Sequence, residues 1–600
     1  MMKTLLLPAL LFCCQMAAFA MQSTVCNPDG TVTFRYKNDH AREVFADVQF
    51  AGRHAMTRDA DGVWSVTLGP AAPDMYPYCF IVDGVSVMDP ENPDYFPNEG
   101  FKSSLLEIPA VTGALPHDIR NVPHGPVEYI HYFSESLGDV NNAVVCLPPS
   151  YYTDTAKRYP VFYLISGTTD TEEVYYKVGR VNYILDNLVA DGNAEEMIVV
   201  LPYGNPGKLS ATPKLSFAGT QDIFGKDLLT DLMPYIEKNY RTINDSDHRA
   251  IGGFSRGGNQ ALAYGLTNLD KFSYLCSYSS FTSTEIPEVY DNSADTNGKI
   301  NLFWLGVGTD DFLYGNARDY MEFLDKKSIR CVKEYTDDKF GHTWMNAKYF
   351  LGKSLPLLFR KEAAREAMNA GRPALAATGN EPQFTPGVMA RLFPKPVVSP
   401  EYLEDGIIFR MKAPEAEKVE FMSELSPAPV IMERDSDGIW EMQMDEGFDK
   451  VFTYRFIVDG TPVADPQNMY IAPSKGFKPS ISRHPACGYV FTSMGRDVPH
   501  GKVRYDLNEG TATYVPAEVA GEEGAPVVVR LLPGADDTAE SWFKVGGADA
   551  IADMMIYSGE CRPCILTTSP VKADCEVRAD DYATWEQRRQ ALKAALLQLK

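Results

Sequence analysis

The sequence predicts a multidomain protein: a small β-sandwich, an α/β domain built on a parallel sheet, a second β-sandwich and a truncated copy of the α/β domain. Three observations lead to this prediction. The chain of 600 residues exceeds what one hydrophobic core usually supports. A block of its sequence occurs twice, and strand and helix patterns alternate after the first occurrence.

Composition limits the class of partner. Apolar residues make up 45% and aromatic residues 12% of the chain, which excludes a largely disordered protein. The 80 acidic and 56 basic residues give a formal charge of −24. Because this charge repels phosphate backbones and anionic lipids, we expect neither nucleic acid nor a membrane surface as a partner. A neutral polymer or a small ester remains compatible.

The first 20 residues are typical of an export signal. Lys3 supplies the positive start, Leu5 to Cys14 the apolar run, and Ala18-Phe19-Ala20 a cleavage pattern of small residues. No later segment offers the ~18 uninterrupted apolar residues of a transmembrane helix. We therefore predict a signal peptide over residues 1–20 and an exported chain, periplasmic or secreted.

The repeated block predicts the two β-sandwiches. Motifs at 61–64, 80–84, 100–102 and 122–125 recur at 437–440, 456–460, 476–478 and 498–501, always 376 residues later (437 − 61). Each copy contains short β-rich runs separated by Asp-Gly and Pro turns. We place the sandwiches at 21–110 and 394–487, with linkers at 111–127 and 362–393.

Residues 128–361 carry the pattern of an α/β domain. Val161 to Ser166 and Met197 to Pro202 are short apolar runs typical of buried parallel strands, whereas Val181 to Ala190 and Leu228 to Tyr240 have helical spacing of apolar residues. This alternation predicts a parallel sheet covered by helices.

A candidate nucleophile lies in the motif Gly253-Phe254-Ser255-Arg256-Gly257-Gly258. A predicted strand, His248 to Gly252, precedes it, and a predicted helix, Asn259 to Leu266, follows. This context is typical of a nucleophile elbow, in which glycines leave room for the strained turn that exposes the serine. Ser255 is therefore the candidate nucleophile.

A serine hydroxyl needs an imidazole to accept its proton and a carboxylate to orient that imidazole. Downstream of Ser255 the apolar run Leu302 to Val307 leads into Asp310 and Asp311. The single histidine between these residues and the end of the domain is His342. The order serine, acid, histidine is that of an α/β-hydrolase triad.

The α/β domain resembles the esterase D and carbohydrate esterase family 1 group, which includes feruloyl and acetylxylan esterases and enterochelin-esterase-like proteins. The motifs that carry this resemblance are Val122-Pro123-His124-Gly125, Asn182-x-x-x-Asp186-Asn187-Leu188, Val199 to Gly204, the Ser255 elbow, Asp311-Phe312-Leu313 and Gly341-His342-Thr343-Trp344. The resemblance implies an α/β-hydrolase fold and the triad Ser255, Asp311 and His342. Asp311 is preferred to Asp310 because the family's acid directly precedes the aromatic residue.

The resemblance also implies an oxyanion hole made by the backbone N–H groups of Thr168 and Arg256. The chain has Ile165-Ser166-Gly167 where the family usually carries a histidine before glycine, and backbone donors tolerate this change. The side chain of Arg256 either favours anionic substrates or pairs with a surface carboxylate, and we favour the pairing.

The sandwiches resemble early-set, immunoglobulin-like domains related to glycogen-binding modules. Trp64 and Trp440 of the repeated turns either stack on a sugar or, as we favour, pack in the core. His124 and His500 lie in the repeated junction motif, for which we expect a structural role. We identify no metal site, since Cys561 and Cys564 form a lone pair that we expect to be a structural disulfide or two buried thiols. A serine triad needs no cofactor.

Residues 488–600 repeat the start of the α/β domain at an offset of 367 (534 − 167), after a loss of about nine residues. Ser255 would recur at 622 (255 + 367), beyond residue 600, so this copy is expected to stop before its nucleophile. A half sheet exposes an edge, and we expect it to pack on the rest of the chain or on a partner unless the gene product is artefactually short.

The triad and the export signal predict an exported serine carboxylesterase. The family resemblance implies its substrate, an acylated polysaccharide or oligosaccharide, and the removal of feruloyl or acetyl groups from plant cell-wall polysaccharide of the xylan type. An enterochelin-like or general short-acyl esterase is the alternative enzyme. A non-catalytic glycan-binding protein is the alternative of another class, suggested by the duplicated sandwiches. The sequence indicates no particular protein partner.

Overall fold

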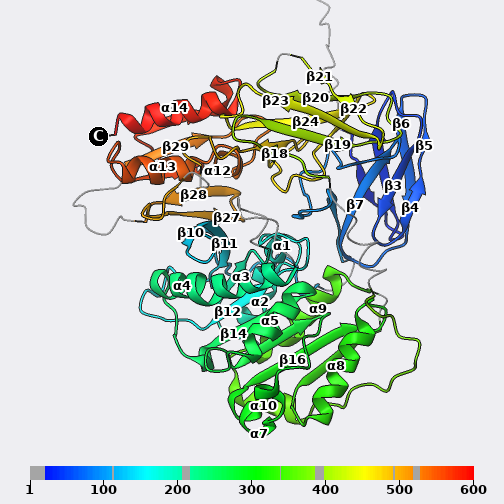
Figure 1. Ribbon diagram of the computed structural model, residues 1–600, viewed down its shortest axis with the longest axis vertical. Coiled ribbons are helices and arrows are strands. Elements are labelled where there is room, and N and C mark those ends of the chain that lie inside the picture. Colours follow the sequence, from blue (N-terminus) through cyan, green and yellow to red (C-terminus); the bar gives the residue numbers. More distant parts are fainter. Residues whose placement is uncertain are drawn as a thin grey trace, which may run out of the picture.

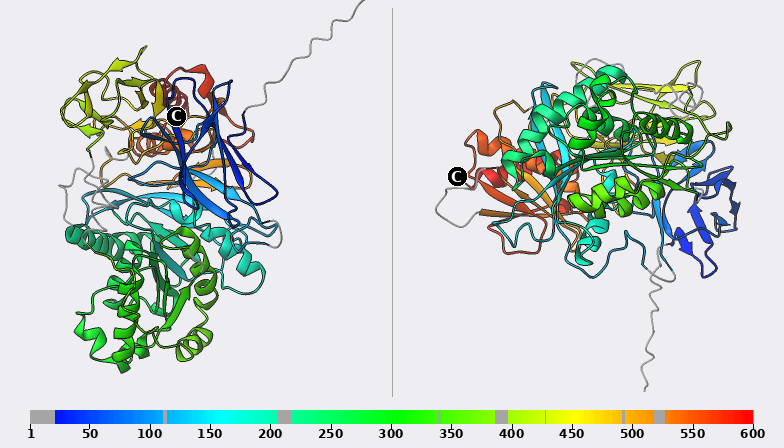
Figure 2. Two further views of the ribbon diagram at one scale, coloured as in Figure 1. Left: turned by 90° about the vertical axis from the view of Figure 1, so that its right-hand side faces the viewer. Right: turned by 90° about the horizontal axis from the view of Figure 1, so that it is seen from below.

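The computed structural model describes residues 21–110, 114–205, 217–337, 340–385, 397–426, 428–490, 494–517 and 527–599. The predicted signal peptide lies outside these residues. Four parts are distinguished below: the first β unit (21–110), the first α/β unit (127–369), the second β unit (397–490) and the second α/β unit (502–599). Both β units lie above the green first α/β unit in Figure 1 and in the left view of Figure 2.

The first β unit consists of two antiparallel sheets, ordered β1-β2-β6-β5 and β4-β3-β7-β8, with β9 beside β7. The strands are β1 (Thr24–Cys26), β2 (Val32–Lys37), β3 (Val44–Val48), β4 (Gly52–Ala55), β5 (Thr57–Arg58), β6 (Val63–Leu68), β7 (Asp74–Val82), β8 (Val85–Val87) and β9 (Ser104–Ile108). Alternate residues of β2 are buried, and its Phe34 ring lies 5.3 Å from the Tyr78 ring of β7. The two sheets therefore pack face to face, which is the layering expected of a β-sandwich.

The second β unit repeats this arrangement as β18-β19-β23-β22 and β21-β20-β24-β25, with β26 beside β24. Its strands are β18 (Glu401–Tyr402), β19 (Ile407–Lys412), β20 (Val419–Ser423), β21 (Val430–Ile431), β22 (Glu433–Arg434), β23 (Ile439–Met444), β24 (Phe452–Val458), β25 (Thr461–Val463) and β26 (Ser480–Ser482). Trp64 and Trp440 are buried, and their indole N–H groups donate to the carbonyls of Asn38 and Ala413. Both tryptophans therefore pack in the core.

The two α/β units share one sheet of 13 strands, ordered β17-β16-β15-β14-β12-β13-β11-β10-β27-β28-β30-β29-β31. In the first unit these are β10 (Val127–Ser134), β11 (Asp139–Cys146), β12 (Val161–Ile165), β13 (Ile198–Pro202), β14 (Arg249–Phe254), β15 (Tyr274–Tyr278), β16 (Leu302–Gly308) and β17 (Val332–Thr336). Strands β12 to β17 pair in parallel as predicted, whereas β10 and β11 are antiparallel, so the sheet is mixed.

The helices of the first α/β unit lie beside the strands of its sheet, as Figure 1 shows. They are α1 (Val174–Lys177), α2 (Val181–Ala190), α3 (Phe217–Lys226), α4 (Met233–Asn239), α5 (Arg256–Leu266), α6 (Pro287–Tyr290), α7 (Ser293–Lys299), α8 (Tyr314–Lys326), α9 (Trp344–Ser354) and α10 (Lys361–Asn369). The predicted helix 228–240 is helical over 228–239, and its first turn belongs to a π-helical segment, Asp227–Leu232, that is continuous with α3 and α4. Helix α10 contacts β16, so the predicted linker 362–393 begins inside a folded helix.

The second α/β unit is joined to the first by strand pairing. It comprises β27 (Lys502–Asp506), β28 (Thr511–Val515), β29 (Val527–Leu532), β30 (Cys564–Thr567), β31 (Cys575–Arg578), α12 (Ser541–Lys544), α13 (Ala548–Tyr557) and α14 (Trp585–Leu597). Strand β27 pairs antiparallel with β10, and Glu128 stands opposite Arg504. Because these two residues are equivalent in the repeat (504 − 128 = 376), the pairing is symmetric, like the interface of a two-fold dimer. The fragment thus packs on the chain itself.

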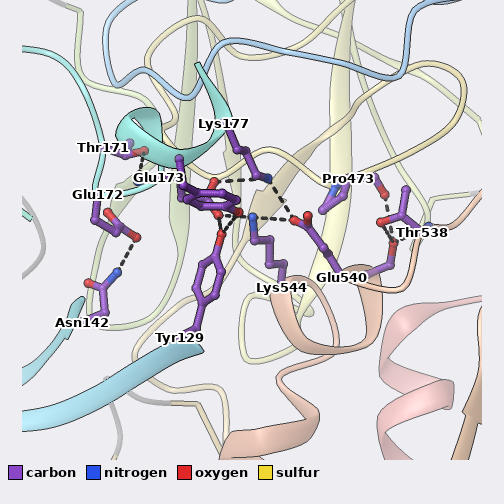
Figure 3. A network of polar contacts seen from close by, with 12 residues as sticks. Tyr129, Asn142, Thr171, Glu172, Glu173, Lys177, Pro473, Thr538, Glu540 and Lys544 are labelled. Atoms are coloured by element: carbon purple, nitrogen blue, oxygen red, sulfur yellow. Dashed lines mark hydrogen bonds and ion pairs between the residues drawn. The ribbon is translucent and has the colours of Figure 1, made fainter. Parts of the chain in front are cut away.

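Four charged side chains reinforce this pseudo-two-fold interface (Figure 3). Lys177 binds Glu540 at 3.1 Å, and its equivalent Lys544 binds Glu173 (544 − 177 = 540 − 173 = 367). Desolvation alone would raise the pKa of Glu540, but attraction to Lys177 and Lys544 lowers it to about 2. Each α/β unit therefore supplies one lysine to the glutamate of the other.

The second α/β unit lacks its middle rather than its end, and the expectation of a simple early stop is wrong in this respect. Helix α14 follows Thr584 and begins with Trp585, just as α9 follows Thr343 and begins with Trp344 (585 − 344 = 241). It contacts α13 as α9 contacts α2. Strand β31 pairs with β29 at the place that β14 takes beside β12. Among the described residues of the second unit, helix α5, which follows Ser255, and strands β15 and β16, which precede Asp311, have no counterpart, while α14 closes a core of its own.

The cysteines from residue 21 onward, which the structure describes, form no disulfide. Each of the nine from Cys26 to Cys575 is a free thiol, and both Cys561 and Cys564 are buried. Of the two alternatives for this pair, the structure shows two buried thiols.

Candidate active site

Ser255 lies at the sharp turn between β14 and α5. Its backbone has φ 57° and ψ −120°, a conformation that L residues rarely adopt. The neighbouring glycines make this turn possible, since a Cβ on Gly257 would lie 2.1 Å from the carbonyl oxygen of Ile165, and one on Gly253 would lie 2.3 Å from the Gly257 backbone. The local sequence therefore folds as the strand–turn–helix elbow that the motif predicted.

The structure brings the three predicted triad residues together. His342 Nε2 lies 2.9 Å from Ser255 Oγ, and His342 Nδ1 lies 2.9 Å from Asp311 Oδ2 and 3.0 Å from Oδ1. Asp310, the alternative acid, is exposed. With Nδ1–H donating to Asp311, Nε2 is free to accept the proton of Ser255.

Burial and packing hold the acid and the base in place. Asp311 is 0% exposed, and its Oδ1 also accepts the backbone N–H of Leu313 at 2.8 Å. The imidazole of His342 lies 4.7 Å from the Phe254 ring and 4.3 Å from the Phe312 ring. The orientation of the histidine is thus fixed by contacts on both its polar and its apolar sides.

The loop that carries Thr168 is supported by the first β unit. Asp170 accepts the N–H of Gly167 at 3.2 Å and a side-chain N–H of Asn98 at 3.1 Å. The N–H of Glu99 donates to the carbonyl of Thr169 at 2.7 Å. Burial raises the pKa of Asp170 to about 6, although attraction to the guanidinium of α5 opposes this shift.

Sequence reasoning missed Asp170 and Asn98. A signal for Asp170 was present, because Gly167-x-x-Asp170 recurs as Gly534-x-x-Asp537 at the offset of 367. Asn98 lies in the first β unit, so no local sequence pattern could predict its contact with the loop of the α/β unit.

Arg256 departs from the expected pairing with a surface carboxylate. The side chain is 7% exposed and donates through Nη1 to the carbonyl of Thr168 at 3.1 Å. Desolvation lowers its pKa, against the attraction of Glu99, Tyr203 and Asp170. Arg256 is therefore buried beside the loop instead of lying on the surface. The N–H groups of Thr168 and Arg256 donate to no backbone carbonyl of the described residues, and their oxyanion role stays a prediction.

The remaining histidine motif is a structural joint. His124 Nδ1 lies 3.0 Å from Asp186, and in the second copy His500 Nδ1 lies 3.4 Å from Asp553. Asp186 also accepts the N–H of Gly125, as Asp553 accepts that of Gly501. Within the described ranges, no group of three or more His, Cys, Asp or Glu side chains could hold a metal ion.

The comparisons with known proteins bear on the segment around this site. Residues 134–341 match the esterase family model ("Putative esterase"), a range that contains Ser255 and Asp311 and stops one residue before His342. The predicted resemblance to esterases is confirmed. The match indicates a carboxylic-ester hydrolase.

Two curated relatives combine xylan-related names with this similarity. The chain is 32% identical over 256 residues, 41% of its length, to an endo-1,4-beta-xylanase/feruloyl esterase of Xylanibacter ruminicola, of which it covers 35%. It is 24% identical over 248 residues to endo-1,4-beta-xylanase Y of Acetivibrio thermocellus, with 36% of this chain and 22% of that protein covered. The chain thus spans about a third or less of the length of these relatives.

Among solved structures, a ferulic acid esterase is 29% identical, with 40% of this chain and 99% of that chain covered and a TM-score of 0.34. An enterobactin esterase of Shigella flexneri is 19% identical, with 55% and 93% covered and a TM-score of 0.42. In the part of the chain that the structure describes, no helix has the length and apolar character needed to span a membrane.

Proposed function

We propose that the chain is an exported serine carboxylesterase that releases feruloyl or acetyl groups from xylan-type polysaccharide. The observation that carries the proposal is the alignment of Ser255 Oγ, His342 and the buried Asp311 through contacts of 2.9 to 3.0 Å. This is the constellation that activates a serine for acyl transfer.

In the proposed mechanism Ser255 Oγ attacks the ester carbonyl while its proton passes to His342 Nε2. Asp311 stabilises the imidazolium that results. The N–H groups of Thr168 and Arg256 stabilise the oxyanion of the tetrahedral intermediate. When the intermediate collapses, His342 returns the proton to the departing sugar oxygen and leaves an acyl-enzyme. Water, deprotonated by the same imidazole, then cleaves the acyl-enzyme and releases the carboxylic acid.

Two lines support the polysaccharide substrate. A curated relative carries the name feruloyl esterase together with xylanase, and the segment that matches the esterase family model holds Ser255. The formal charge of −24 also suits a neutral polymer better than a polyanion. The export signal at residues 1–20 would bring the enzyme to a substrate outside the cell.

The test is release of ferulate and of acetate from arabinoxylan by the purified chain without residues 1–20, with Ser255→Ala as control. Release of either acid by the wild type alone supports the proposal. Turnover of nitrophenyl acetate without release from the polymer would favour a general short-acyl esterase. Binding to xylan with no turnover of any ester would favour a glycan-binding protein.

A further inference from the structure

A cavity lies between the second β unit and the second α/β unit, at the place that corresponds to the Thr168 loop of the first α/β unit. The cavity measures about 430 Å³, within the range of about 300–1,000 Å³ for ligand pockets. Its lining includes residues of 473–479 and 534–537, which are equivalent to 97–103 and 167–170. A backbone bridge joins Ser474 to Asp537, as another joins Asn98 to Asp170. The framework of the site has therefore been kept.

The catalytic groups have not been kept. In the register of the two Thr-Trp helices, His342 corresponds to Ala583 (583 − 342 = 241), and the elbow with Ser255 has no counterpart. Helix α14 supplies a different side chain, Arg588, whose Nη1 binds Asp537 at 3.0 Å. The cavity therefore has its own set of polar contacts, and ester hydrolysis by a serine triad is excluded there.

The lining combines aromatic rings with guanidinium groups. Arg588 lies 4.4 Å from the Trp585 ring centroid, and Arg455 lies 5.7 Å from that of Phe477. Arg455 donates to Met422 Sδ at 3.3 Å and forms no ion pair among the described residues. A guanidinium carries five N–H donors, so Arg455 retains donor capacity at the cavity.

The charges at the cavity identify the class of ligand. Beside the two arginines it is lined by four carboxyl groups, those of Glu424, Asp536, Asp537 and Asp580. Positive charge is not in excess, so the cavity does not suit a phosphate or a polyanion. Donors and acceptors of both kinds next to aromatic faces suit the hydroxyl groups and apolar ring faces of a sugar.

We propose that this cavity is a non-catalytic binding site for a neutral oligosaccharide. The choice of a xylan chain as that oligosaccharide rests on the proposed function of the first unit. A second contact on one polymer would raise the effective concentration of ester bonds at Ser255.

The experiment measures binding of unacylated xylohexaose to the full chain by titration calorimetry, because this probe contains no ester for Ser255 to cleave. Arg455→Met and Phe477→Ala are expected to weaken binding at least about tenfold, a loss of about 1.4 kcal/mol. Turnover of methyl ferulate in the same preparations should stay within about twofold of the wild type. Lys412→Ala, an exposed cation on β19, is the matched control and should leave both readouts unchanged.

Each outcome decides the proposal. Wild-type protein that does not bind xylohexaose, or variants that bind it as well as the wild type, would overturn it. Tighter binding of an oligogalacturonate than of xylohexaose would also overturn it, since the site would then prefer an anion. If either variant fails to fold by circular dichroism, Asp536→Ala at an exposed position takes its place. Methyl ferulate turnover without glycan binding refutes this site alone, whereas binding without turnover refutes only the proposed esterase.

Discussion

The two α/β units are built on the same framework, and only the first has the complete constellation for ester hydrolysis. Both keep the Gly-x-x-Asp loop, the joint between a histidine and an aspartate, and a helix that begins with Trp344 or Trp585. Only the first keeps the elbow of Ser255, the acid Asp311 and the base His342. The comparison separates residues that both units share from the residues of the proposed catalytic triad.

This separation explains why His124 needs no catalytic role. His500 makes the same contact with an aspartate in a unit that has no nucleophile. Because the histidine–aspartate pair is present in both units, its role is one that both units need. It joins the chain that enters each unit to helix α2 or α13.

The largest expected effect is on the nucleophile. Ser255→Ala should lower kcat on soluble esters by about 10⁶-fold, because the second unit has no serine elbow that could replace it. Initial rates on nitrophenyl acetate, with circular dichroism to verify the fold, measure this effect. Binding of xylohexaose by the same variant should be unchanged. Substantial turnover by folded Ser255→Ala would show that chemistry occurs elsewhere in the chain.

The acid gives the next largest effect. Asp311→Asn should lower kcat by about 10⁴-fold, because an amide does not hold the imidazole in the tautomer that accepts the serine proton. Asp310→Asn, at the exposed neighbouring position, is the matched control and should change kcat by less than about threefold. If side-by-side kinetics show that Asp310→Asn lowers kcat more than Asp311→Asn does, the acid of the triad is Asp310 and not Asp311.

The interface between the units tests their pseudo-symmetry. Lys544→Met removes one partner from Glu173 and Glu540, which are largely buried, and should destabilise the fold by about 4 kcal/mol. Lys177→Met should have a similar effect, since it removes the equivalent charge. Urea unfolding measures both, and Lys544→Arg, which keeps the charge, is the control. A large difference between the two methionine variants would mean that the symmetry does not extend to the energetics.

Local patterns predicted which residues meet at the candidate site better than they predicted the assembly of the units. Ser255, Asp311 and His342 were found because each lies in a short motif after a buried apolar strand, in the order of a known triad. The pairing of Glu128 with Arg504 could not be found in this way, because strand edges join through backbone groups that every residue carries.

The extent of the second α/β unit could not be predicted from a single constant offset. The offset of 367 relates 167–179 to 534–546, whereas the similarity of Trp344 and Trp585 has an offset of 241, after the deleted middle. The burial of Arg256 depends on two contacts of the loop that carries Thr168. Asn98 of the first β unit binds Asp170, 72 positions away (170 − 98), and Arg256 binds Thr168, 88 positions away (256 − 168). Contacts of this kind arise from tertiary structure alone.

The smallest expected effect concerns the aspartates of the two Gly-x-x-Asp loops. Burial raises the pKa of Asp170 to about 6, so the folded state holds its proton more tightly than the unfolded state does. The contribution of this group to stability is therefore greatest below about pH 4, falls as the pH rises to about 6 and stays low above that value. Asp170→Asn keeps an oxygen for the N–H of Gly167 and lacks the buried charge. The free energy of unfolding of Asp170→Asn, measured relative to that of the wild type, should therefore rise by about 3 kcal/mol between pH 4 and pH 7. Asp537→Asn should instead lose stability at pH 7, because Arg588 loses its carboxylate. Thermal unfolding of both variants at the two pH values measures this contrast, and a loss of stability by Asp170→Asn that grows as the pH rises would contradict it.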